Sequence, residues 1–263
     1  MMSAFVRPST LSSRLLAVMA VLMVVATSTT LLRAQSTLKT ARVTLAEGTL
    51  TTGLLGKPAT TPLTKGAVMT SDNYARTGAG SRAEFEFADG SLFRIGERTI
   101  FSFEGGGRTL RVDEGDGLLS IPKRQGQTTI TTPALSAAVM GTTIYISIRP
   151  EGTTYACLEG KCKVGPHMML PGHILTVSGA GRNYAGAPLR RFRIAEFVRT
   201  HGLFTRFRSR LPGAKLIEAE AKAQDSGAAA ATTPAKPSPA PATTTPATST
   251  LRERIIKRRS ATP

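Results

Sequence analysis

Short runs of apolar residues that alternate with polar ones extend from Thr40 to about Gly181. The clearest run is segment 82–87, in which Ala and Phe alternate with Arg and Glu at the period of two expected for a half-buried strand. Asp89-Gly90 follows it and is the strongest short turn signal. Further runs of this kind lie at residues 92–95, 100–103, 110–112, 118–121, 128–131, 142–148, 153–158, 161–164 and 174–177. Their spacing of roughly ten residues predicts a mainly β domain over residues 40–181, without alternating β and α units.

The pattern changes in the last third of the chain, where arginines are interleaved with large apolar residues over Leu189–Leu211. This favours a helix with phenylalanines on one side, interrupted near Gly202 and ended by a Pro-Gly pair. A second short helix is predicted over Ala214–Gln224. Residues 186–225 are therefore expected to form a basic amphipathic helical segment.

A polar tail completes the chain over residues 226–263. Up to Thr250 it contains only Ala, Thr, Pro, Ser, one Gly and one Lys. Such a segment cannot bury enough apolar surface to offset its ordering entropy, so we expect it to be disordered. It ends in a small basic tip, Leu251–Arg259.

The N-terminus has the pattern of a secretory signal peptide. Arg7 and Arg14 precede an unbroken apolar run over Leu15–Ala26, and cleavage after Ala34 would remove residues 1–34. The alternative is an uncleaved anchor over residues 15–32, a stretch at the lower limit of a membrane span. Both alternatives place the rest of the chain outside the inner membrane, in the periplasm or secreted.

The charge is strongly positive, with a formal net charge of +17. Residues 35–185 hold 16 basic and 12 acidic residues, whereas residues 186–263 hold 15 basic and 5 acidic ones. The excess therefore lies in the C-terminal third. Because the chain is expected to be exported, we predict that it does not bind nucleic acid.

A catalytic or metal-binding constellation is not recognisable in the sequence. It has no nucleophile-elbow, phosphate-loop or zinc-protease motif. His167 and His173 lie six residues apart without a third ligand nearby, so ordinary loop histidines are favoured over a metal site. The acidic stretch 113–117 lacks the spacing of an EF-hand and is expected to be a charged turn. We predict no enzyme activity, cofactor, metal or small-molecule substrate.

The two cysteines, Cys157 and Cys162, flank the segment 158–161. If Glu159-Gly160 formed a two-residue hairpin turn, the cysteines would face each other closely enough to bridge. In an oxidising compartment a structural disulfide is favoured over two free thiols or a redox site, because the sequence has no C-x-x-C motif.

Several short motifs stand in an order that is typical of one family. They are Asn73-Tyr74-Ala75-Arg76-Thr77, Ser81-Arg82-Ala83-Glu84-Phe85, Ala88-Asp89-Gly90-Ser91, Thr132-Pro133-Ala134 leading to Val139-Met140-Gly141-Thr142, Glu159-Gly160-Lys161, and Leu170-Pro171-Gly172. Together they resemble the periplasmic domain of the FecR-type regulator family over roughly residues 46–180.

The resemblance implies an exported, mainly β domain, solenoid-like or sandwich-like, that acts through protein contacts and not through catalysis. In the best-known members this domain relays the state of an outer-membrane siderophore receptor to a cytoplasmic anti-sigma segment. Here about 14 residues precede the apolar run, too few for a folded anti-sigma domain, so a stand-alone FecR domain is expected. Structural turn roles are expected for Asp89, Gly90, Ser91 and Gly141.

The leading hypothesis is an exported protein-interaction, sensing or scaffolding module of the cell envelope, with an envelope protein as partner. The alternative is a structural envelope protein, tethered to anionic membrane or polymer by its basic C-terminal segment. The residues expected to contact such an anionic surface are Arg190, Arg191, Arg193, Arg199, Arg206, Arg208 and Arg210. In a purely structural role, the neighbouring phenylalanines would instead cap the open end of the β core while the arginines stay in water.

Overall fold

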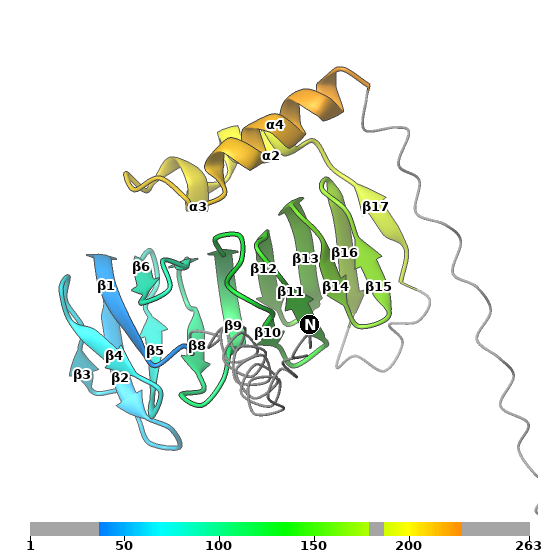
Figure 1. Ribbon diagram of the computed structural model, residues 1–263. Coiled ribbons are helices and arrows are strands. Elements are labelled where there is room, and N and C mark those ends of the chain that lie inside the picture. The colour runs from blue at the N-terminus through cyan, green and yellow to red at the C-terminus, as the bar shows by residue number, and fades with distance from the viewer. Residues whose placement is uncertain (1–36, 179–186, 228–263) are drawn as a thin grey trace, which may run out of the picture. The chain divides into compact units, whose positions relative to one another are not determined.

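The computed structural model describes residues 37–178 and 187–227, and the structural statements below concern these two ranges. Two β-sheets, A and B, face each other, and short helices follow them in the chain (Figure 1). The predicted mainly β fold with short helices near the C-terminus is thus confirmed. The predicted signal segment 1–34 lies outside the described residues, as does the predicted tail beyond Gly227.

Sheet A is antiparallel throughout. Its strands, in spatial order, are β4 (Val68–Thr70), β1 (Thr40–Glu47), β6 (Arg82–Phe87), β7 (Leu92–Ile95), the second half of β9 (Thr109–Ser120), β12 (Thr143–Arg149), β13 (Gly152–Glu159), β16 (His173–Ser178) and β17 (Leu189–Arg191).

Sheet B is antiparallel except where β9 and β10 run in parallel. Its strands, in spatial order, are β3 (Thr61–Pro62), β2 (Leu50–Leu54), β5 (Asn73–Thr77), β8 (Ile100–Phe103), the first half of β9, β10 (Thr128–Thr131), β11 (Ser136–Val139), β14 (Cys162–Val164) and β15 (His167–Met169).

Strand β9 belongs to both sheets, because its first half pairs with β8 and β10 and its second half with β7 and β12. The acidic stretch 113–117 lies in the middle of this strand, so the expected charged turn is wrong. A register shift opposite Ile100 and the left-handed conformation of Gly115 (φ +88°) let the strand change sheets here. A Cβ at Gly115 would lie 2.2 Å from Thr99 Oγ1, so a glycine is also required sterically.

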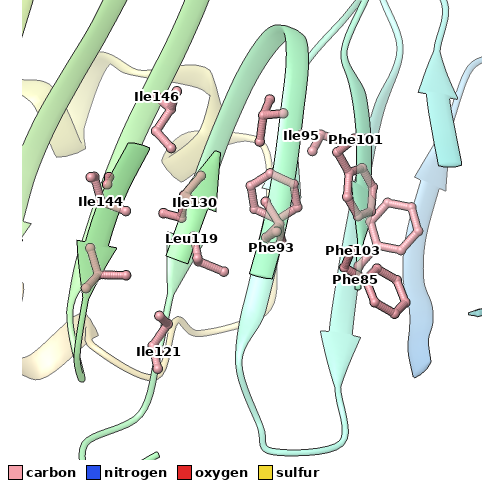
Figure 2. Packing of buried hydrophobic residues seen from close by; sticks show 14 of the residues in the cluster. Phe85, Phe93, Ile95, Phe101, Phe103, Leu119, Ile121, Ile130, Ile144 and Ile146 are labelled. Atoms are coloured by element: carbon pink, nitrogen blue, oxygen red, sulfur yellow. The ribbon is translucent and has the colours of Figure 1, made fainter. Parts of the chain in front are cut away.

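The core fills the space between the two sheets (Figure 2). Phe101 of sheet B packs edge-on against Phe85 and Phe93 of sheet A, with ring centroids 4.7 and 5.0 Å apart. Aromatic rings therefore occupy one part of the core, and aliphatic side chains such as Ile144 and Ile146 occupy the other (Figure 2). Each such aromatic pair contributes about 0.5–1.5 kcal/mol beyond its buried area.

Consecutive hairpins alternate between the sheets from β10 onward. The β10–β11 and β14–β15 hairpins extend sheet B, and the β12–β13 and β16–β17 hairpins extend sheet A. The facing sheets form a sandwich, while the alternating hairpins advance along it in the manner of a solenoid.

The predicted disulfide between Cys157 and Cys162 is present, but the predicted hairpin around it is wrong. Cys157 lies on β13 of sheet A, and Cys162 lies on β14 of sheet B. The chain turns at Gly160 (φ +77°) and crosses from one sheet to the other, so these strands do not pair with each other. The disulfide therefore ties the two sheets together across the core.

Three helices cover the outer face of sheet A: α2 (Ile194–Thr200), α3 (Gly202–Thr205) and α4 (Ala214–Asp225). We call residues 194–225 the helical layer. Its apolar side chains pack against those that sheet A directs away from the core, including Leu118, Tyr145 and Leu158. The expectation that the phenylalanines cap the open end of the core is therefore wrong, because the layer covers a face of sheet A.

No helix in the described ranges combines the length and hydropathy needed to cross a bilayer.

Removal of the disulfide should reduce stability without preventing folding. The bridge joins residues five apart, so the entropy that it removes from the unfolded chain is small and its loss should cost about 2 kcal/mol. We expect urea unfolding of Cys157→Ala/Cys162→Ala to show this loss in a single transition. Alkylation of unreduced native protein, read by mass spectrometry, is the control, and labelling of both thiols would contradict the bridge.

Candidate functional site

A buried ion pair joins the helical layer to sheet A. Glu84 on β6 and Arg94 on β7 lie opposite each other, and each side chain is 2% exposed. Arg94 Nε donates to Glu84 Oε2 at 2.8 Å, while Arg94 Nη1 donates to the Leu203 carbonyl at 2.9 Å. Arg94 Nη2 donates to the carbonyl of Ser209, whose hydroxyl donates to Glu84. The pair therefore bonds at once to two strands and to the segment around α3.

The environment of Glu84 favours its charged form. Burial opposes ionisation, but hydrogen bonds from Ser209, Arg94 and Thr44 outweigh it, so the pKa of Glu84 lies below its usual value of 4.5. The Arg94 guanidinium also stacks over the Phe207 ring, 4.8 Å from its centroid. Loss of either charge would leave the other buried without compensation.

A second buried carboxylate lies beneath the N-terminus of α4. Glu159 accepts from Lys123 Nζ at 2.9 Å and from Thr143 Oγ1 at 3.3 Å. Burial raises the pKa of Glu159, although Lys123 lowers it. The N–H of Gly213, the residue before α4, donates to Ser120 Oγ at 3.1 Å. A Cβ at Gly213 would lie 2.5 Å from Thr143 Oγ1, so the helix can approach the sheet this closely because the residue is glycine.

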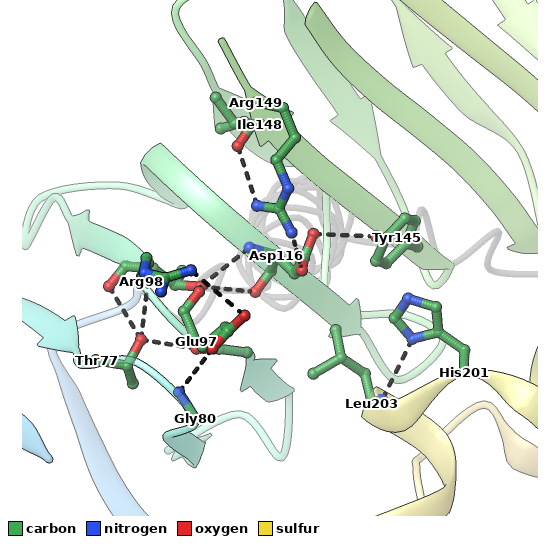
Figure 3. A network of polar contacts seen from close by, with 12 residues as sticks. Thr77, Gly80, Glu97, Arg98, Asp116, Tyr145, Ile148, Arg149, His201 and Leu203 are labelled. Carbon is green, nitrogen blue, oxygen red and sulfur yellow. Dashed lines mark hydrogen bonds and ion pairs between the residues drawn. The ribbon is translucent and has the colours of Figure 1, made fainter. Parts of the chain in front are cut away.

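An aromatic and polar network supports α2 (Figure 3). Tyr145 on β12 donates to Asp116 Oδ1 at 3.1 Å, and Asp116 also pairs with Arg149. The His201 ring stacks on Phe197 and meets Tyr145 edge-on, with centroids 4.6 Å apart in both cases. Burial lowers the pKa of His201 and raises that of Tyr145. A neutral His201 fits its role, because its Nδ1 accepts from the Leu203 N–H at 3.2 Å.

A groove opens in the helical layer between α2 and α4. Its volume is about 580 Å³. Apolar side chains dominate its walls, namely Ala195, Val198, Phe204, Leu211, Ala214, Ile217 and Ala221. Charged residues form its rim, with Arg210 paired to Glu218 at 3.4 Å and Asp225 paired to Arg193 at 2.7 Å. A concave apolar surface with a few polar groups around it is typical of a binding site.

A second, polar cleft of about 520 Å³ lies where Glu97 and Arg98 approach the β12–β13 turn. Arg98 has a left-handed backbone (φ +48°), and its guanidinium pairs with Glu97 at 3.6 Å. Glu97 also accepts from the Gly80 N–H at 2.6 Å (Figure 3). In the described ranges no group of three or more His, Cys, Asp and Glu side chains is placed to hold a metal ion.

The seven arginines assigned to anionic-surface binding are all exposed. Two lie on the edge strand β17, and the others lie before, within and after the first two helices of the layer.

The predicted turn residues lie elsewhere in the fold. Gly90 has φ +79°, and Asp89 accepts from the Ser91 N–H at 2.8 Å and pairs with Arg108. Gly141 (φ +57°) packs against Lys123, whose Cα would lie 2.9 Å from a Cβ there.

Glu84, Arg94 and Glu159 were missed by the sequence analysis, which placed Glu84 on the polar side of a half-buried strand. One signal could have found them. Segments such as 92–95 and 156–158 carry apolar residues at both parities of the strand period, and this predicts a strand that is covered on both faces. A charged residue on such a strand has to be paired.

Comparisons with known proteins support the resemblance inferred from the motifs. Residues 73–163 match the family model described as FecR protein, which supports a regulatory or sensing role. No curated protein matches the sequence. Two crystal structures of a "putative anti-sigma factor" from Parabacteroides distasonis are similar, with TM-scores of 0.41 and 0.40 and 14% identity. The similar region covers 48% of this chain and 65% and 64% of those chains, less than two thirds of each.

Glu84→Gln should destabilise the protein by about 3 kcal/mol at neutral pH, because it leaves the buried Arg94 charge uncompensated. A lowered pKa in the folded state adds stability above pH 4.5, and this is lost as the pH falls through the folded-state pKa. The difference in unfolding free energy between wild type and variant should therefore shrink below about pH 4.5. Urea unfolding at a series of pH values measures it.

Glu159→Gln is the matched control, because the raised pKa of Glu159 acts in the opposite direction. Its contribution is present at low pH and is lost as the pH rises through the folded-state pKa. Wild type should therefore gain stability relative to this variant as the pH falls. Parallel pH profiles for the two variants would contradict the assigned environments.

Gly213→Ala should cost about 1–3 kcal/mol, because the new methyl group collides with Thr143 and with Glu159 Oε1 at 2.8 Å. Gly106→Ala is the control, since a Cβ there meets no atom within 4 Å. Thermal unfolding should give a lower midpoint for Gly213→Ala than for Gly106→Ala. Equal midpoints for the two variants would show that α4 does not lie this close to the sheet.

Proposed function

Starting from the FecR region at residues 73–163, we propose that this chain is an exported, non-catalytic regulatory or sensing protein that binds a protein partner in the cell envelope. The observation that carries the proposal is the apolar groove of the helical layer. The groove lies on a sheet that is itself crosslinked to its partner sheet, so its walls are held on a rigid base. Sites on such a base suit recognition better than sites on loops.

The titratable groups with shifted pKa values support binding over catalysis. Glu84 is engaged by Thr44, Arg94 and Ser209, and the bond from Ser209 joins the helical layer to the sheet. Glu159 is engaged by Lys123 and Thr143. His201 accepts a hydrogen bond from Leu203, and Tyr145 donates one to Asp116. The His201 and Tyr145 rings pack against each other. Shifted values of this kind arise in structural networks as well as in active sites.

The disulfide and the predicted signal peptide support the proposed export to the cell envelope. Disulfides persist in oxidising compartments such as the periplasm and are rare in the cytosol. Both cysteines are fully buried, which fits a structural bridge and not a redox site.

A tether to an anionic polymer or membrane is the second candidate. It is favoured by the exposure of all seven arginines of the basic segment. It differs from the first candidate in its salt dependence, because contacts between exposed charges weaken strongly as ionic strength rises.

Photo-crosslinking in intact cells tests the proposal. A crosslinking amino acid at Thr205, an exposed residue of the groove wall on α3, should trap a discrete protein partner in the envelope fraction. The same amino acid at Val68, exposed on the edge strand β4, is the matched control and should trap none. Recovery of the protein in the cytoplasm, or equal crosslinking from both positions, would overturn the proposal.

A further inference from the structure

The walls of the groove are the faces of two helices. Ala214, Ile217 and Ala221 follow one another at spacings of three and four along α4, and Ala195 and Val198 do so along α2. Residues at this spacing share one helix face. Three of these five side chains are alanines, which allow the backbone of a third helix to approach to ordinary helix-packing distance.

The charge that remains available around the groove is positive. Residues 187–227 hold nine basic and four acidic residues, a net charge of +5. The rim acids Glu218 and Asp225 are already paired with arginines. Lys222 on the rim has no acidic partner in the described ranges, nor have Arg206 and Arg208, which precede the rim residue Arg210. Charge complementarity therefore favours an acidic occupant.

The helical layer does not present the surface of a membrane-inserting helix. Such helices expose aromatic or leucine side chains to the acyl region. Here Phe197 and Phe204 pack against each other, and Phe207 lies buried against Arg94. Leu216, at 41% exposure, is the exposed large hydrophobic residue of the layer among the described residues. Apolar anchors for this groove therefore have to come from the partner.

We propose that the groove binds an acidic amphipathic helix of a partner protein, with apolar residues at i, i+4 and i+7 and acidic residues along their flanks. The inference rests on the proposed function and names the class of its partner. The apolar stripe enters between α2 and α4, and the acidic flanks meet Lys222 and the arginines that follow α3.

A labelled peptide tests the proposal on the full chain. The probe is a fluorescein-labelled helical peptide of about 18 residues, with a leucine stripe flanked by glutamates and with alanine and glutamine elsewhere. A second peptide carries lysines in place of the glutamates. Fluorescence anisotropy should show saturable binding of the acidic peptide, weakened by salt, and much weaker binding of the basic one.

Two pairs of variants on α4 locate the binding. Ala221→Phe fills the groove and should weaken binding of the acidic peptide roughly tenfold or more. Ala219 is exposed on the same helix outside the groove, so Ala219→Phe should leave binding unchanged. Lys222→Glu on the rim should weaken binding several-fold, and Lys215→Glu should leave it unchanged. The lysine variants are on the surface, so they remain informative even if Ala221→Phe fails to fold.

Three results would overturn the inference. They are absence of saturable binding of the acidic peptide, equal binding of both peptides, and equal effects of the groove variants and their controls. Binding to phosphatidylglycerol vesicles that Ala221→Phe or Lys222→Glu abolishes would assign the groove to lipid instead and would overturn it as well. If a crosslinker at Thr205 still traps a protein in cells when the peptide test fails, the partner class is wrong and the proposed function stands.

Discussion

The position of the helical layer on sheet A depends on the buried Glu84–Arg94 pair. An arginine and a glutamate with 2% exposure each are costly to bury, and the cost is offset because every nitrogen of the guanidinium is bonded. Two of these bonds go to backbone carbonyls around α3. Hydrogen bonds are directional, so they hold this segment in one position, which apolar contacts at the same place would not do. The pair thus fixes where the layer lies on sheet A, and with it the width of the groove between α2 and α4.

Two covalent connections, in addition to packing, hold the two sheets in place relative to each other. Strand β9 contributes to both sheets through a bulge at the glycine-containing stretch 113–117, and the Cys157–Cys162 bridge links them again further along. Between these points the core is a closely packed set of aromatic and aliphatic side chains. The groove consequently lies on a base that cannot shear without breaking a strand or a disulfide.

Most of the strands and the three helices could be predicted from the sequence, because each depends on local periodicity and turn chemistry. Segment 82–87, the Asp89-Gly90 turn and the helix after the second Pro-Gly pair are such cases. What failed depended on partners distant in the chain. The stretch 113–117 was expected to form a charged turn, but it lies inside β9, where the pairing changes from β8 to β12. Glu84 was expected to meet water, but residues 203–209 cover it, and no local pattern in segment 82–87 encodes that cover.

The long separation between the ion pair and its cover has a consequence for the order of assembly. Arg94 bonds to residues 109 and 115 positions later in the chain, while its own hairpin closes within ten. A chain that emerges N-terminus first therefore completes most of its β-sheets before the helical layer exists. Until then Glu84 and Arg94 lie on an open sheet face in contact with water, charged and soluble. The helical layer, which emerges after the sheets, both dehydrates the pair and creates the groove, so a chain that lacks it does not display this binding surface.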